Sequence, residues 1–86
     1  VPDRVGNVSL SRACANHDTC YGILGAPRTV CDAGLGRDIL VDCMAQSSNS
    51  VFCLSLAETY YIGVTLFGRG PYRAAQHEAI RRRFGN

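Results

Sequence analysis

A histidine, an aspartate, a tyrosine and two cysteines fall within the eight residues Cys14-Ala15-Asn16-His17-Asp18-Thr19-Cys20-Tyr21. In a helix, His17 and Tyr21 share one face a turn apart, while Asp18 is rotated by about 100° from His17. A base and a ligand for a hard cation can therefore point into one cleft from different directions. An imidazole can take a proton from water, and a cation held partly by a carboxylate can stabilise the oxyanion formed when an ester is attacked.

A histidine that acts as a base also needs a carboxylate to orient it. The candidates are Asp32, Asp38 and Asp42 in the next segment. We favour Asp32, because Cys31 beside it could be bridged to Cys20, which would pin the two segments together and leave Asp32 facing the cleft. Asp38 and Asp42 are four residues apart and are more simply interpreted as a solvated helix face.

Zinc binding by Cys14, His17, Cys20 and Cys31 is the competing interpretation of the same segment. It is disfavoured because a residue six positions further along a helix is rotated by about 240° from the first. No catalytic motif surrounds Tyr60, Tyr61 or His77. We therefore expect the two tyrosines to lie in the core or to be half-buried, and the histidine to be exposed.

The first helix is expected to run from Ser9 or Ser11, which can cap it, to Leu24, because Gly25 and Pro27 stop it. Residues 1–8 predict an irregular lead-in. A second helix is predicted from about Thr29 to Ser47, antiparallel to the first.

A third helix is predicted from Val51 to Leu66 by apolar residues at helical spacing, although Gly63 and its β-branched neighbours leave a strand possible near its end. The segment 68–71 is a break. Pro71 suits the first position of a short fourth helix that ends before Gly85.

With 86 residues the chain is expected to form a single domain, 1–86, with a small core. Five cysteines in so short a chain favour disulfides and an oxidising compartment, so we expect a secreted protein. No apolar run reaches about 18 residues, so no membrane-spanning segment is expected. Residues 69–86 hold five of the nine basic residues, all arginine, yet lack the stacking aromatics of a nucleic-acid-binding surface.

Residues 8–68 resemble the phospholipase A2 superfamily, most closely its small bacterial and fungal secreted enzymes. Three motifs carry the resemblance: C-x-x-H-D-x-x-Y over 14–21, the pair Cys31-Asp32, and D-x-x-x-x-C over 38–43. The segments 59–61 and 67–68 are similar to the end of those enzymes. The domain is thus divided into a lead-in, 1–8, a family-like core, 9–68, and a basic C-terminal extension, 69–86.

The resemblance implies a small all-α, disulfide-stapled domain in which two antiparallel helices carry the active site and one or two further helices follow. His17 would be the base, Asp32 its orienter, and Tyr21 a hydrogen-bonding support for Asp32. Asp18 would be a carboxylate ligand of a Ca²⁺ cofactor. The implied reaction is hydrolysis of the sn-2 ester of glycerophospholipids at a membrane surface or micelle.

The family's calcium loop would lie upstream of Val1, so the chain is expected to be a processed or clipped piece. Five cysteines can form two bridges in 15 ways, and the residues alone leave these open. The resemblance implies the pairs Cys20–Cys31 and Cys43–Cys53, with Cys14 unpaired here or bridged to an upstream segment or second chain.

A different class of function competes with catalysis. The chain could be a phospholipase-like binding or toxin module that keeps the scaffold without turning over substrate. A further variant is the catalytic end of a larger exported effector, with an immunity or inhibitor protein as its partner. The basic extension could be a solvated helix or could rest on an anionic bilayer.

Overall fold

The computed structural model describes residues 3–85, which form four helices and a short two-stranded ribbon. The ribbon pairs β1 (Arg4–Val5) with β2 (Val8–Ser9), and the helices are α1 (Ser11–Tyr21), α2 (Arg28–Gln46), α3 (Ser50–Phe67) and α4 (Arg69–Phe84). The expected small all-α domain with two disulfides is confirmed.

The start of the chain differs from the prediction in two ways. The lead-in is not irregular throughout, since β1 and β2 pair antiparallel across a turn in which Gly6 has a φ of 58°. Val1 and Pro2, also in the predicted lead-in, lie outside the described residues. In addition, α1 has Leu10 rather than a serine at its N-cap and ends at Tyr21, three residues before Leu24.

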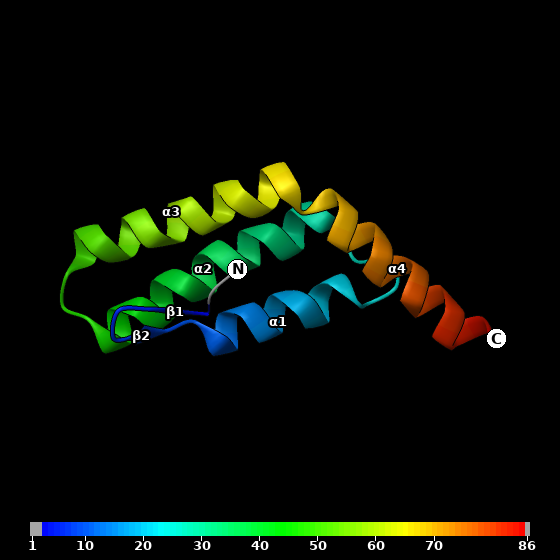
Figure 1. The fold of residues 1–86 in the computed structure, drawn as a ribbon, viewed down its shortest axis with the longest axis horizontal. Helices are drawn as coiled ribbons and strands as arrows, with labels where there is room; N and C mark the ends of the chain where they lie inside the picture. The colour runs from blue at the N-terminus through cyan, green and yellow to red at the C-terminus, as the bar shows by residue number, and fades with distance from the viewer. Residues whose placement is uncertain (1–2, 86) are drawn as a thin grey trace.

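The second helix is the centre of the fold. Figure 1 shows α2 between α1 and α3, antiparallel to α1, and α2 packs against both of these helices. Its apolar face contributes Leu35, Ile39 and Cys43 to the core. The disulfide Cys20–Cys31 ties the end of α1 to the start of α2, and a second disulfide, Cys43–Cys53, ties α2 to α3. Closing a loop of about ten residues contributes roughly 3 kcal/mol by restricting the unfolded chain.

The break predicted near residue 68 is a corner of one residue. Gly68 ends α3 and directly precedes α4, which begins two residues earlier than Pro71. Pro71 is tolerated there because the first turn of a helix has amide groups without intrahelical partners. The corner sends α4 across the end of the domain where α1 connects to α2 (Figure 1).

One helix of the described part, α3, is long and apolar enough to cross a membrane by length and composition alone, although the sequence had predicted no membrane-spanning segment. This criterion is weak evidence by itself. Within the domain α3 buries Cys53, Leu56 and Ala57 and leaves most of its length exposed.

Candidate active site

Three of the residues singled out in the sequence meet in one buried cluster. Nε2 of His17 lies 2.8 Å from Oδ1 of Asp32, and the hydroxyl of Tyr21 donates a hydrogen bond of 2.5 Å to the same oxygen. The one-turn spacing on α1 places His17 and Tyr21 side by side, with their ring centroids 4.1 Å apart. Asp32 reaches them from the second turn of α2, next to the bridge from Cys31 to Cys20 that ties the two helix ends together.

Asp32 is a buried carboxylate, with 3% of its surface exposed, so it needs partners on both oxygens. His17 and Tyr21 serve Oδ1, and Arg28, one turn earlier in α2, lies 3.6 Å from Oδ2. Arg28 also donates to the backbone oxygens of Val64 and Thr65 and thereby links this carboxylate to the end of α3.

The contacts of Tyr21 favour a protonated phenol. Burial raises the pKa of Tyr21 above its usual value, and the hydrogen bond to Asp32 raises it further. The phenol therefore keeps its proton and remains a hydrogen-bond donor to Asp32 at any physiological pH.

An apolar cleft of about 570 Å³ lies beside this cluster and is lined by residues of α1 and α3, by one residue of α2 and by the corner between α3 and α4. His17 and Tyr21 lie on its wall, whereas Asp32 does not line it and sits behind them. Leu35, Val64 and Phe67 supply apolar surface. The expectation that Asp32 itself faces the cleft is wrong, because the two α1 rings cover it.

The second ring nitrogen of His17 is not used in the contact with Asp32. Its Nδ1 accepts or donates no hydrogen bond to the protein among residues 3–85. In that part of the chain every buried side-chain nitrogen or oxygen has a hydrogen-bond partner, so Nδ1 is not buried. Nδ1 is therefore reached by solvent. A hydrogen bond that fixes one ring nitrogen sets the tautomer, so a proton on Nε2 leaves a lone pair on Nδ1.

Asp18 is exposed and lines the same cleft next to His17. A carboxylate is the type of ligand that calcium prefers, but calcium takes about 6 to 8 oxygens. Within residues 3–85, no three His, Cys, Asp or Glu side chains lie close enough together to form a metal site. The side chains described thus provide one suitable carboxylate and not a complete shell.

The cysteines follow the pairing that the resemblance implied. With Cys20 and Cys31 joined in a disulfide, the alternative zinc site loses two of its four ligands. Cys14 is free, half-buried and on the cleft wall, three residues before His17. Burial raises the pKa of the Cys14 thiol, and the nearby carboxylates of Asp18 and Asp3 raise it further, so the thiol stays protonated at neutral pH.

Sequence reasoning missed four residues that support the cluster: Arg28, Gly68, Tyr72 and Gln76. Arg28 carried a usable signal, since a basic residue four positions before Asp32 is correctly spaced for an ion pair on one helix. Gly68 was assigned only to a break. Nothing local marks Tyr72 or Gln76, because their partners Ala26, Tyr21, Ile23 and Gly25 are about fifty residues away.

The two other aspartates considered as orienters lie away from His17. Asp42 accepts hydrogen bonds from Arg12 and so links α2 to α1, and Asp38 accepts one from Asn16. Both are partly covered, so they are not the solvated face that their spacing predicted. His77 is exposed, as expected.

The chain was compared with protein-family models, with curated proteins and with solved structures, and none of these matches it. A function for this chain is therefore inferred from its residues and from their geometry.

Proposed function

We propose that this chain is a calcium-dependent phospholipase A2 that hydrolyses the sn-2 ester of glycerophospholipids with a water activated by His17. The observation that carries the proposal is the buried contact between His17 and Asp32, supported by Tyr21, on the wall of an apolar cleft. An exposed His–Asp pair would mean little. A buried carboxylate that holds one imidazole nitrogen while the other is open to a cleft is the arrangement that a general base requires.

In the proposed reaction, Nδ1 of His17 accepts a proton from water as the water oxygen attacks the ester carbonyl carbon. Asp32 accepts the hydrogen bond from Nε2–H and stabilises the imidazolium without taking its proton. When the tetrahedral intermediate collapses, the bond to the glycerol oxygen breaks and the imidazolium returns its proton to that oxygen. The products are a free fatty acid and a lysophospholipid.

The lining of the cleft favours a lipid over a polar ester. A cleft of about 570 Å³ is within the usual range for small-molecule sites, and apolar lining favours the burial of acyl chains. Phe67 lies on its rim and 78% of its surface is exposed, so it can contact both an acyl chain and a lipid surface. A phospholipid membrane or micelle is therefore the proposed partner.

Calcium belongs to the proposal, with Asp18 as one of its ligands. Its other oxygens would come from backbone carbonyls, from waters or from residues upstream of those described, with Cys14 as an anchor for such a segment. A bound calcium would stabilise the negative charge that develops on the ester carbonyl oxygen. Secretion fits the same proposal, because two disulfides form and persist in oxidising compartments.

The test is hydrolysis of phospholipid vesicles labelled in the sn-2 acyl chain, with millimolar calcium or a chelator. The protein should include any residues encoded upstream of Val1. We expect His17→Gln to lose at least a hundredfold in rate, because general-base catalysis contributes about 10²–10⁴-fold. His77→Gln is the matched control, since the same change at an exposed histidine should leave the rate unchanged.

Circular dichroism separates chemistry from folding in this test. His17→Gln should keep the helical spectrum of the wild type, since glutamine can still donate to Asp32. Turnover retained in His17→Gln would exclude His17 as the base. If the folded wild type binds vesicles but neither hydrolyses them nor binds calcium, the chain is instead a non-catalytic binding or toxin module.

A further inference from the structure

We propose that Gln76 of α4 is a positioning residue that clamps the C-terminal end of α1 and so holds Tyr21 against Asp32. This inference rests on the proposed function, because it assigns α4 a part in the same site. It concerns a segment that lies beyond the residues resembling phospholipases.

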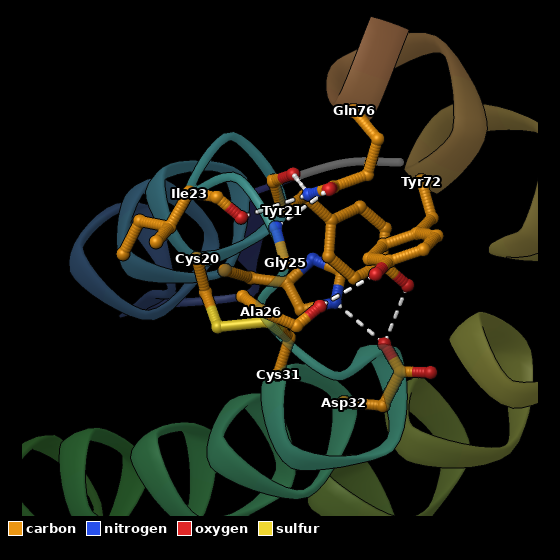
Figure 2. The surroundings of a disulfide bond; sticks show 10 residues. Cys20, Tyr21, Ile23, Gly25, Ala26, Cys31, Asp32, Tyr72 and Gln76 are labelled. Carbon is orange, nitrogen blue, oxygen red and sulfur yellow. Dashed lines mark hydrogen bonds and ion pairs between the residues drawn. A yellow bond between two sulfur atoms is a disulfide. The ribbon is translucent and has the colours of Figure 1, made fainter. Parts of the chain in front are cut away.

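Both the nitrogen and the oxygen of the Gln76 side-chain amide form hydrogen bonds with backbone atoms at the end of α1 and in the loop that follows it. Its Nε2 donates to the backbone oxygens of Tyr21 and Ile23, each at 2.8 Å, and its Oε1 accepts from the amide of Gly25 at 2.9 Å. The last carbonyls of a helix have no partners within the helix. One glutamine from α4 thus binds the last carbonyl of α1, that of Tyr21 (Figure 2), while the three carbonyls before it accept from the backbone amides of Gly22 and Ile23.

Hydrogen bonds hold both the backbone and the side chain of Tyr21. Gln76 binds its backbone oxygen, while its hydroxyl donates to Asp32. Between these points its ring meets the edge of Tyr72, with the ring centroids 5.2 Å apart and an interplanar angle of 82°. Figure 2 shows Gln76 and Tyr72 approaching from α4 on one side of Tyr21 and Asp32 on the other.

A second residue of α4, Tyr72, also binds the loop between α1 and α2. The hydroxyl of Tyr72 donates to the backbone oxygen of Ala26 at 2.5 Å, directly before Pro27 and the start of α2. Residues of α4 are otherwise half-buried or exposed, and none is fully buried. Because α4 buries so little, directional hydrogen bonds and the ring contact hold it in place. The connection between α1 and α2, which sets the distance from Tyr21 to Asp32, is therefore fixed from outside by α4.

A purely structural cap would make the domain more stable and do nothing more. A positioning role also requires that the clamp sets the hydrogen bond between Tyr21 and Asp32, and through Asp32 the imidazole of His17. Two readouts separate these possibilities: the division of any kinetic effect between kcat and KM, and the ionisation of the Tyr21 phenol.

The test compares Gln76→Ala with His77→Ala, an exposed neighbour on the same helix, in the protein with any residues encoded upstream of Val1. Alanine favours helix, so neither change should unwind α4. We expect Gln76→Ala to lower kcat for vesicle hydrolysis by about tenfold, a loss of about 1.4 kcal/mol in transition-state stabilisation, with little change in KM. His77→Ala should match the wild type.

The phenol ionisation is followed by nuclear magnetic resonance of ring-labelled tyrosine, with Tyr21→Phe to assign the signal. The Tyr21 signal should titrate at lower pH in Gln76→Ala than in the wild type. If Gln76→Ala lowers only the melting temperature, while kcat and the Tyr21 titration stay unchanged, Gln76 is a structural cap and the inference is wrong. An inactive wild type would defeat the proposed function alone, because the titration still decides whether Gln76 positions Tyr21.

Discussion

Asp32 is a buried charge whose partners come from two helices. His17 and Tyr21 approach one oxygen from α1, and Arg28 approaches the other from the preceding turn of α2. Without such partners a buried carboxylate is strongly destabilising, so these contacts offset the loss of hydration. The same contacts fix the imidazole, so one set of interactions serves both the stability of the fold and the proposed catalysis.

Removing the Tyr21 hydroxyl should therefore destabilise the protein in a pH-dependent way. Hydrogen bonds to charged groups contribute about 1.5–3 kcal/mol, so we expect Tyr21→Phe to lower the free energy of unfolding by that amount at pH 8. The raised pKa of Tyr21 means that the folded protein holds this proton more tightly than the unfolded chain, whose tyrosines ionise near pH 10. The contribution is thus complete below about pH 10 and is lost as the pH rises through the folded-state pKa.

Urea unfolding at several values from pH 8 to pH 11 measures this difference. A Cys14→Ser background in both proteins prevents thiol exchange with the disulfides. The advantage of the wild type over Tyr21→Phe should begin to fall above pH 10. A constant difference across the range would show that the phenol is not held as described.

The site is assembled by the order of the helices and by their short connections. The central helix α2 presents Asp32 at its start, α1 presents two rings beside it, and the corner at Gly68 returns α4 to the end of α1. Gly68 is buried, and a methyl group there would lie 2.5 Å from the Tyr21 hydroxyl and would also clash with the Val64 carbonyl. Only glycine lets the chain pass this close to Tyr21.

Gly68→Ala is expected to push the Tyr21 hydroxyl away from Asp32 or to shift the corner. Overpacking of this kind costs about 1–3 kcal/mol in unfolding free energy. Gly70→Ala is the matched control, because a methyl group added at Gly70 would meet nothing within 4 Å and alanine is compatible with the first turn of α4. Urea unfolding should show Gly68→Ala destabilised and Gly70→Ala unchanged or slightly stabilised; equal stability of the two variants would contradict this account of the corner.

The sequence predicted most of the helical layout because its signals are local. Helical spacing and the stops at Gly25 and Pro27 placed the helices to within a few residues, and the spacing of His17 and Tyr21 placed both rings on one face. The ends were less predictable, since α1 stops at Tyr21, whose carbonyl oxygen accepts a hydrogen bond from Gln76. Such contacts depend on α4 folding back, which no local pattern encodes.

The whole domain is elongated, about 48 × 20 × 18 Å, and its core is thin. Many large apolar side chains are consequently exposed, among them Leu54, Ile62, Leu66 and Phe67 on α3. Phe67 also lines the cleft, so the route from an apolar exterior into the site is continuous at this point. This shape agrees with the proposal that the protein works on a lipid surface. The two disulfides and the hydrogen bonds from Gln76 and Tyr72 of α4 keep the site ordered.

The central claim is that Asp32 fixes His17 so that Nδ1 keeps a free lone pair. The most direct measurement is nuclear magnetic resonance of ¹⁵N-labelled imidazoles at a pH where the rings are neutral, because it needs neither calcium nor lipid. We predict that the His17 ring carries its proton on Nε2 with slow exchange, while exposed His77 exchanges rapidly and serves as the internal reference. A proton on Nδ1 of His17, or tautomer averaging like that of His77, would contradict the account.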